Sequence, residues 1–544
     1  MARARRLPLA PWALQTHNTP AEVTKGAATV KPIRLFVSVL TVSFWTLMSR
    51  VLGLAREIVI LAVIGPGPVM DAFVAAFRLP NMFRRFFAEG AFNAAFVPLY
   101  SKKVEGDEDH QKFARDAMNG LAVVVLSLTA LAMVFMPAFV WAVAEGFAGD
   151  ARFELTVYYG RIAFPYILFI SLAALFSGIL NASGHFAAAA AAPVLLNVLI
   201  ILALLGAPLI GADAISALIW AIPVAGIAQL ALVWIAAERI GVRLRPGLPR
   251  LTPDMTRLIS VAVPAALAGG VMQINLLVGQ QVASNFDKAV GWLYAADRLY
   301  QLPLGVVGIA IGIVLLPDLS RRLKAGDDGG ARTAFSRAGE MSLALTLPAA
   351  VALMVVPLPI VSVLFERGAT GADDSAAIAL AVAIYGLGLP AFVLQKILQP
   401  LYFAREDTRR PFRFAVWSMI VNAVAAVGLA PWLGWIAPAL ATTVAGWAMV
   451  WWLARGAASM GETARFDRRF HDRLWRIVLA SALMGVALYA ASVALAQGLG
   501  TAGWRYLALA GLITLGAVTY GIAGLLLGAF RMSDLKSMLR RGPA

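Results

Sequence analysis

The chain has 544 residues, of which 60% are hydrophobic and only 14% are charged, with a mean hydropathy of +0.78. Soluble domains are nearer half apolar and a quarter charged, so this composition predicts an integral membrane protein and argues against a tethered soluble enzyme. The net charge of +16 suits basic loops beside an anionic cytoplasmic leaflet better than a nucleic-acid partner, so we expect no nucleic acid. Cysteine is absent and the four histidines form no ligand pattern, so we expect no metal site.

Residues 1–35 are basic and contain no long apolar run, which predicts a disordered cytoplasmic extension rather than a signal peptide. Beyond them, the sequence holds fourteen stretches with the roughly 20 apolar residues that a helix needs to cross a bilayer. Continuous runs of this kind predict helices, because a closed barrel would need short alternating strands. The predicted spans are 36–64, 71–100, 117–145, 155–181, 188–209, 213–237, 258–284, 292–319, 338–365, 376–403, 411–430, 433–453, 475–497 and 502–530.

Lysine and arginine are distributed very unevenly among the loops. If the N-terminus is inside, the loops on the other side hold only Arg152, Lys288, Arg367 and Arg505, and all other basic loop residues lie inside. Because basic residues accumulate on the cytoplasmic side of membrane proteins, we predict that both termini are cytoplasmic.

A faint internal repeat relates the two halves of the chain. Leu79-Pro80 recurs as Leu302-Pro303, and Pro165 recurs as Pro390, each pair lying six spans apart. Chance recurrence is one explanation. The other is a parallel repeat, since an even offset preserves orientation. The predicted fold is therefore an all-α polytopic membrane protein with two six-helix lobes, 36–237 and 258–453, two further helices in 475–530, and a cytoplasmic tail, 531–544.

Several predicted spans contain charged side chains, although each costs roughly 2.5–3.5 kcal/mol at a bilayer centre. These residues must face a hydrated interior or one another. Internal ion pairing, such as Arg50 with Glu57 or Arg85 with Glu89, is one explanation, since Arg50 and Glu57 share a helix face. The network in the first, second and eighth spans comprises Arg50, Arg56, Glu57, Asp71, Arg78, Arg84, Arg85, Glu89, Asp297 and Arg298.

The arginines of this network outnumber its carboxylates by six to four, which predicts a positive cavity for an anion. The planar fork of arginine suits phosphate or carboxylate. The sequence has no Walker A motif and no other catalytic pattern, so we expect a transporter without cofactor or catalytic residues. Transport would then be driven by an ion gradient or the membrane potential.

The block "SRVLGLAREIVI…DAFVAAFRLPNMFRRFFAEGAFNAAFVPLYS", residues 49–101, resembles the MurJ (MviN) family of lipid II flippases. Further blocks are "FPYILFISLAALFSGILNASG" (164–184), "YAADRLYQLPLGVVGIAIGIVLLPDLS" (294–320) and "YFAREDTRRP" (402–411). The resemblance covers roughly residues 36–530. It implies a member of the MOP exporter superfamily, similar to MATE transporters, with two six-helix lobes and two C-terminal helices beside a hydrophobic groove.

Members of that family move lipid II, an undecaprenyl-pyrophosphate-linked disaccharide-pentapeptide, from the cytoplasmic to the periplasmic leaflet for peptidoglycan synthesis. The resemblance thus implies alternating access in the bacterial inner membrane, with membrane lipids and other cell-wall synthesis proteins as candidate partners. It also implies that Arg50, Arg56, Arg84 and Arg298 bind the substrate, and that Asp71 and Glu89 are the acidic family positions.

The sequence leaves the coupling ion and the exact substrate open. Some family members resemble sodium-coupled transporters with a carboxylate in the seventh span, whereas 258–284 has only Gln273, Asn275, Gln280 and Gln281, so the coupling ion is undetermined. An alternative function is another MOP-type exporter of oligosaccharide-lipid or drugs, because an oligosaccharide-lipid would satisfy the arginines equally well. A non-transporting membrane scaffold or sensor would instead use the charges only for internal pairing.

Overall fold

The computed structural model describes residues 32–85, 91–106 and 108–530 of the chain, and within these ranges all regular secondary structure is helical, as predicted. The helices are α1 (Pro32–Val63), α2 (Pro68–Arg84), α3 (Ala91–Glu105), α4 (His110–Val134), α5 (Met136–Val143), α6 (Ala151–Ala163), α7 (Tyr166–Ala182), α8 (Phe186–Gly206), α9 (Ala214–Arg239), α10 (Pro253–Ala283), α11 (Ala289–Lys324), α12 (Asp328–Val355), α13 (Pro357–Phe365), α14 (Ala372–Phe403), α15 (Arg409–Leu433), α16 (Ala437–Ala457), α17 (Arg468–Ala494), α18 (Ala496–Gly500) and α19 (Trp504–Leu526).

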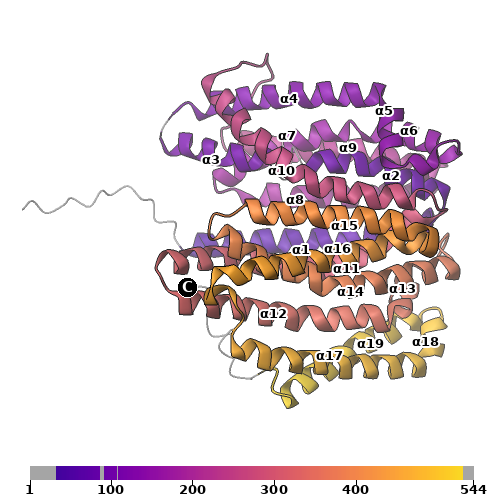
Figure 1. Cartoon of the computed structure of the whole chain (residues 1–544). Coiled ribbons are helices and arrows are strands. Elements are labelled where there is room, and N and C mark those ends of the chain that lie inside the picture. The colour runs from indigo at the N-terminus through magenta and orange to yellow at the C-terminus, as the bar shows by residue number, and fades with distance from the viewer. Residues whose placement is uncertain (1–31, 86–90, 107, 531–544) are drawn as a thin grey trace, which may run out of the picture.

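The long helices lie side by side and run between the same two ends of the molecule (Figure 1). One end, which we call the basic end, carries the α3–α4, α9–α10 and α11–α12 connections. The other, which we call the outer end, carries the α1–α2, α5–α6 and α13–α14 connections. This is the arrangement that consecutive membrane crossings produce.

Each of the fourteen predicted spans coincides with one helix or with two consecutive helices. In the described part of the chain, nine segments are long and apolar enough to cross a membrane. The count of fourteen is compatible with these elements and stays a prediction.

Several spans expected as single helices are divided, and proline explains where. α5 and α13 each begin with a proline at the first or second position, and Pro165 stands directly before α7. Proline has no N–H to donate and its ring clashes with the preceding turn, so it ends one helix but is well suited to start the next. The spans 117–145, 155–181 and 338–365 therefore each consist of two helices.

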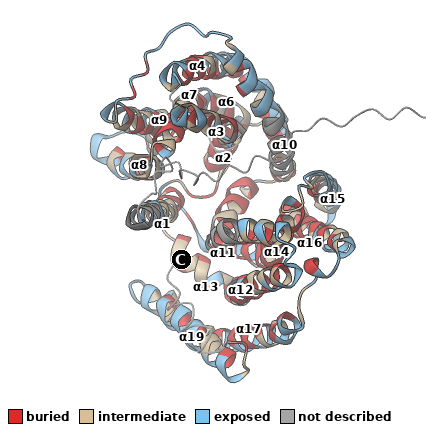
Figure 2. Cartoon of the chain, turned by 90° about the vertical axis from the view of Figure 1, so that its left-hand side faces the viewer, coloured by how far each residue is buried: buried red, intermediate tan, exposed pale blue. Residues whose placement is uncertain are grey.

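Viewed along the helices, the molecule forms two groups (Figure 2). One group contains α2 to α9, and its core includes Phe96, Phe164 and Phe176, all with essentially no exposed surface. The other contains α11 to α16, and its core includes Phe335, Leu401 and Tyr402. Helix α1 lies between the groups and packs mainly against α8. The α2 and α11 helices both contain the repeated Leu-Pro pair.

Helix α10 also lies between the groups and contributes to the packing of both. Its first turns bring Met255 and Leu258 into the core of the first group, whereas Val282 near its end packs with the second group.

At the basic end, Lys103 of α3 pairs with Asp254 of α10 at 3.0 Å. The pKa of Lys103 is raised, first by its hydrogen bond to Glu108 and then by that to Asp254. Helix α10 begins at Pro253, so the predicted start of the second lobe at 258 lies just inside this helix.

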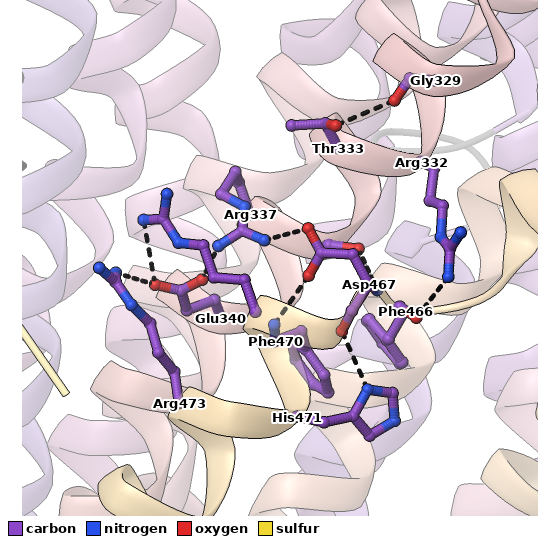
Figure 3. Close-up of polar contacts among 12 residues, drawn as sticks. Gly329, Arg332, Thr333, Arg337, Glu340, Phe466, Asp467, Phe470, His471 and Arg473 are labelled. Carbon is purple, nitrogen blue, oxygen red and sulfur yellow. Dashed lines mark hydrogen bonds and ion pairs between the residues drawn. The ribbon is translucent and has the colours of Figure 1, made fainter.

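The last two long helices, α17 and α19, form a hairpin at the far side of the second group (Figure 2). Figure 3 shows how polar residues fix α17 to α12. Arg337 of α12 donates to both Glu340 and Asp467, and Arg473 of α17 donates to Glu340. Arg469 lies 3.6 Å from the same carboxylate. This cluster holds the hairpin against the second group near the basic end.

Candidate functional site

The centre of the predicted charge network is Glu57 of α1, whose side chain is almost fully buried. Its Oε1 atom accepts hydrogen bonds from the guanidinium of Arg56 and from the hydroxyl of Tyr294, the latter at 3.1 Å. The Nε atom of Arg298 lies 3.6 Å from the same oxygen. Because Tyr294 and Arg298 belong to α11, one carboxylate oxygen brings together arginines from α1 and from the second group.

Arg56 is fixed from the first group by Asn197 of α8. Its Nη1 atom donates to Asn197 Oδ1 at 3.0 Å, and Asn197 Nδ2 donates to the backbone carbonyl of Ser49 at 3.0 Å. A side-chain amide that both accepts and donates can orient a guanidinium in this way. The position of Arg56 is therefore set by α1 and α8 together.

Arg298 is more accessible than Arg56. Its guanidinium carbon lies 4.6 Å from the centre of the Tyr294 ring, within the range of a cation–π contact, and about a third of its side chain is exposed. An arginine that is anchored on one side and exposed on the other can receive a further anion.

Asp297 points into a separate small cavity of about 80 Å³ next to the arginines. It accepts a hydrogen bond from Gln301. Arg78, Tyr300, Tyr385 and Gln280 also line this cavity. The structure therefore brings Arg78 and Asp297 together in one cavity, which Tyr294 also lines. The side chains of Gln273 and Asn275 lie outside the described part of the structure.

The remaining predicted arginines lie at different places. Arg50 lies on α1 with its guanidinium against the backbone of Gly305 of α11. Arg84 is the last residue of α2 and donates to Asn81 Oδ1 at 3.3 Å, one turn earlier in the same helix. Arg85, directly after it, is exposed. Glu89 lies outside the described residues, so its predicted pairing with Arg85 is untested.

Asp71 lies away from the arginine cluster, at the outer end. Its carboxylate is fully buried and accepts the backbone N–H of Gly291 at 2.8 Å, across the interface between the groups. Arg152 of α6 lies 3.7 Å from it and also pairs with Asp150 at 2.6 Å. The pKa of Asp150 lies below its usual range, first because its carboxylate accepts the Arg152 backbone N–H. Asp71 thus belongs to a contact that holds the two groups together.

Further hydrogen bonds close the outer end around Asp71. The backbone N–H of Ala369 donates to the Ala62 carbonyl at 2.9 Å, and the Thr370 hydroxyl donates to the Leu61 carbonyl at 2.7 Å. On the opposite side, the N–H of Gly146 donates to Ser284 Oγ at 3.0 Å. The first two bonds join α1 to the connection between α13 and α14 in the second group, and the third joins the α5–α6 connection of the first group to the end of α10. The structure is therefore closed at the outer end.

Three residues of the site were not predicted from the sequence: Asn197, Tyr294 and Arg152. Asn197 is a single polar residue within an apolar helix, and Tyr294 stands one turn before Arg298 in the block 294–320, but neither carries a charge that would have drawn attention to it. Arg152 was counted among outer-loop residues, yet only 6% of it is exposed and it compensates the charge of Asp71. A polar residue in the middle of a membrane helix is a useful signal, but its partner becomes visible only in the fold.

The site and the fold define a polytopic helical transporter of two packed lobes, with buried arginines between them. No group of residues that could hold a metal ion occurs in the described part of the chain. The family model described as "Lipid II flippase MurJ" matches residues 60–512, which is more than half of the chain. The chain therefore belongs to the MurJ family of lipid II flippases.

Two relatives support this assignment, and a solved structure shows the same fold. A probable lipid II flippase MurJ of Rhizobium meliloti (strain 1021) is 44% identical over 512 residues, covering 92% of this chain and 96% of the relative. One of Rhizobium tropici is 48% identical over 415 residues, covering 75% and 78%. A lipid II flippase MurJ structure in an inward closed conformation has a TM-score of 0.75 at 24% identity, covering 90% of this chain and 98% of its own.

The fold is also similar to that of a multidrug resistance MATE family transporter of the MOP superfamily in an inward-facing conformation. Here the TM-score is 0.65 at 15% identity, over 78% of this chain and 98% of the other. This likeness confirms the predicted MOP-type architecture, and at this identity it shows the fold alone.

Proposed function

We propose that this protein moves lipid II from the cytoplasmic to the periplasmic leaflet of the bacterial inner membrane for peptidoglycan synthesis. The observation that carries the proposal is the convergence of Arg56 and Arg298 on one oxygen of Glu57. Two guanidinium groups from opposite sides of an interface share a single carboxylate, so their charge is only partly compensated. A pyrophosphate offers more oxygen acceptors than that carboxylate and can bind both.

Arg50 and Arg84 complete the proposed substrate-binding set. Among the described residues, no ion pair compensates Arg50, which lies on the same helix as Arg56. Arg84 is half-buried at the end of α2, directly before the sequence "RFFAEGAF" at 85–92. In a partly dehydrated cavity, each charge-assisted hydrogen bond to the pyrophosphate is worth roughly 1.5–3 kcal/mol.

The arrangement also suggests how binding is coupled to movement. An anion held by Arg56 and Arg298 draws α1, which packs mainly against α8 of the first group, toward α11 of the second group. Release on the outer side requires the hydrogen bonds of Ala62, Leu61 and Asp71 to break. Alternating access then consists of exchanging closure at the outer end for closure at the basic end.

We place the prenyl tail of the substrate along α17 and α19. Both helices present large exposed apolar side chains, among them Val486, Tyr489, Leu507, Ile513 and Ile522. Burial of a prenyl chain against such a surface is favourable by about 0.8 kcal/mol per CH₂, although membrane lipids compete for it. Other cell-wall synthesis proteins that supply or use lipid II are the proposed protein partners.

Transport in this proposal needs no cofactor and is driven by an ion gradient or by the membrane potential. The sequence has no nucleotide-binding motif. The coupling step is unassigned, because the seventh span has glutamines in place of a carboxylate.

Depletion of the protein in living cells, followed by leaflet-resolved measurement of lipid II, tests the function. We expect lipid II to accumulate in the cytoplasmic leaflet. An exporter of oligosaccharide-lipid or drugs is the alternative that the MATE-like fold favours. Purified protein in vesicles would distinguish the two, because movement of an oligosaccharide-lipid without movement of lipid II would overturn the proposal.

A further inference from the structure

Two pairs of residues face each other across the contact between α1 and α11. Arg50 and Glu57 are seven residues apart on α1, and Arg298 and Gly305 are seven residues apart on α11. Seven residues make almost two turns, so the members of each pair share a helix face. Glu57 lies against Arg298, and Arg50 lies against Gly305. The two helices therefore meet in two contacts, Glu57 with Arg298 and Arg50 with Gly305, which lie about two helical turns apart.

The Arg50–Gly305 contact exists because residue 305 has no side chain. A Cβ atom at this position would overlap Nη1 of Arg50 and would lie 2.7 Å from its Cζ and 2.8 Å from its Nη2. A Cβ atom essentially never approaches a non-bonded heavy atom of another residue within 3.0 Å. The guanidinium can therefore rest on the α11 backbone only if residue 305 is glycine.

We infer that Gly305 is a positioning residue that seats the guanidinium of Arg50 against α11. The seat fixes this guanidinium on the α11 side of the lobe contact, two turns from Arg298 and toward the basic end. The inference rests on the proposed function, since it assigns a purpose to Arg50 only as a ligand of the substrate pyrophosphate.

The obstacle to a larger residue is the far end of a flexible side chain rather than backbone. An alanine at 305 is accommodated when the Arg50 guanidinium moves away, and alanine favours a helix more than glycine does. Other glycines differ in this respect. A Cβ at Gly146, for example, would lie 2.6 Å from the backbone carbonyl carbon of Ser284. Substitution at 305 should therefore displace Arg50 without preventing folding.

The test compares Gly305→Ala with Gly428→Ala in the full-length protein. Gly428 is an interior residue of α15, and a Cβ there would meet no atom within 4 Å. We expect both variants to reach the membrane in wild-type amounts. Displacement of a binding group by about 1 Å can cost up to 100-fold, so we expect Gly305→Ala to weaken lipid II binding and flipping by about tenfold or more. Gly428→Ala should match the wild type.

A double variant separates positioning of Arg50 from a general packing effect. If Gly305 acts through Arg50, adding Gly305→Ala to Arg50→Lys should cause little further loss of lipid II binding by the purified protein. A full additional loss, or wild-type binding by Gly305→Ala, would overturn the inference. If Arg50→Ala and Gly305→Ala both bind and flip lipid II normally, the role proposed for Arg50 fails as well. If Arg50→Ala is inactive while Gly305→Ala is normal, the positioning role of Gly305 is wrong and the proposed role of Arg50 stands.

Discussion

The hydroxyl of Tyr294 donates a 3.1 Å hydrogen bond to Oε1 of Glu57, and this bond joins α11 to α1. The same oxygen faces Arg56 and Arg298. One atom thus takes part both in the contact between the two groups of helices and in the proposed anion site. A ligand that competes for the arginines must therefore also change the contact.

Removal of Glu57 should cost far more stability than removal of its hydrogen bond to Tyr294. Glu57→Ala leaves Arg56 and Arg298 facing each other without a counter-charge, and loss of one member of a buried ion pair costs about 3–5 kcal/mol. Tyr294→Phe keeps the ring beneath Arg298 and loses one bond to a charged group, worth roughly 1.5–3 kcal/mol. Thermal unfolding of the purified variants measures the difference. Equal melting temperatures for the two would contradict the central position of Glu57.

At the outer end, Asp71→Ala should loosen the closed contact between the groups. It removes the acceptor of the Gly291 N–H and leaves buried Arg152 without its partner in α2. Because the chain has no cysteine, Val290→Cys provides a single label site that is buried beside this contact. We expect a membrane-impermeant thiol reagent to label it faster in Asp71→Ala than in the parent.

Asp287→Ala is the matched control for this experiment. Asp287 also lies near Arg152, at 3.5 Å, but its side chain is 90% exposed. Exposed ion pairs contribute little, so labelling should stay at the parental rate. Equal labelling in Asp71→Ala and Asp287→Ala would show that Asp71 does not hold the outer end closed.

Glu340→Ala should release the α17–α19 hairpin from the second group. The substitution leaves Arg337 and Arg473 without the carboxylate they share, and the expected loss is about 3 kcal/mol in the free energy of unfolding. Faster proteolysis after Arg465, in the connection that precedes α17, reports the release. Glu462→Ala, whose partners lie at the surface, should cleave at the parental rate. Unchanged proteolysis of Glu340→Ala would exclude this cluster as the anchor.

The orientation prediction concerns the two ends of the bundle. Reporter domains fused after Ser101, Arg250 and Ala544 should all report the cytoplasm, because basic residues gather in the connections at these points. Ser101 lies near the end of α3 and Arg250 precedes α10, both at the basic end. A periplasmic signal from any of the three fusions would contradict the predicted topology.

The helical fold could be predicted because an apolar run of bilayer length leaves the backbone few alternatives. What the runs did not reveal is the division of spans at Phe135, Pro165 and Val356. Apolar residues continue across these points, so only a proline at or within two residues of each one marks the break. Hydropathy describes how well side chains suit the lipid, and it does not show where the backbone hydrogen bonds of a helix are interrupted.

The charge network was predicted less completely than the fold. Helical spacing placed Arg50 and Glu57 on one face, and both residues do contact α11. The suggested ion pair between them is wrong, since Glu57 instead pairs with Arg56 and Arg298. Seven residues of helix span about 10.5 Å, which is long for such a pair, and the true partner on α11 is 241 residues away in sequence. Partners of this kind are fixed by packing, which the pattern of a single helix does not contain.

The most direct test of the proposed function replaces Arg56 and Arg298 separately with alanine. Both side chains contact Glu57, so the alternative of purely internal pairing expects less folded protein, whereas a substrate site expects folded protein that does not flip. Arg161, an exposed arginine of α6, provides the control Arg161→Ala. Membrane abundance is measured beside activity in every variant.

The decisive measurement is leaflet-resolved lipid II in cells that depend on each variant. We predict that Arg56→Ala and Arg298→Ala reach the membrane and leave lipid II in the cytoplasmic leaflet, while Arg161→Ala moves it normally. Arginine to lysine at the same two positions should restore only part of the activity, because lysine keeps the charge but loses the fork. Normal movement of lipid II by well-inserted Arg56→Ala and Arg298→Ala proteins would contradict the arginine site.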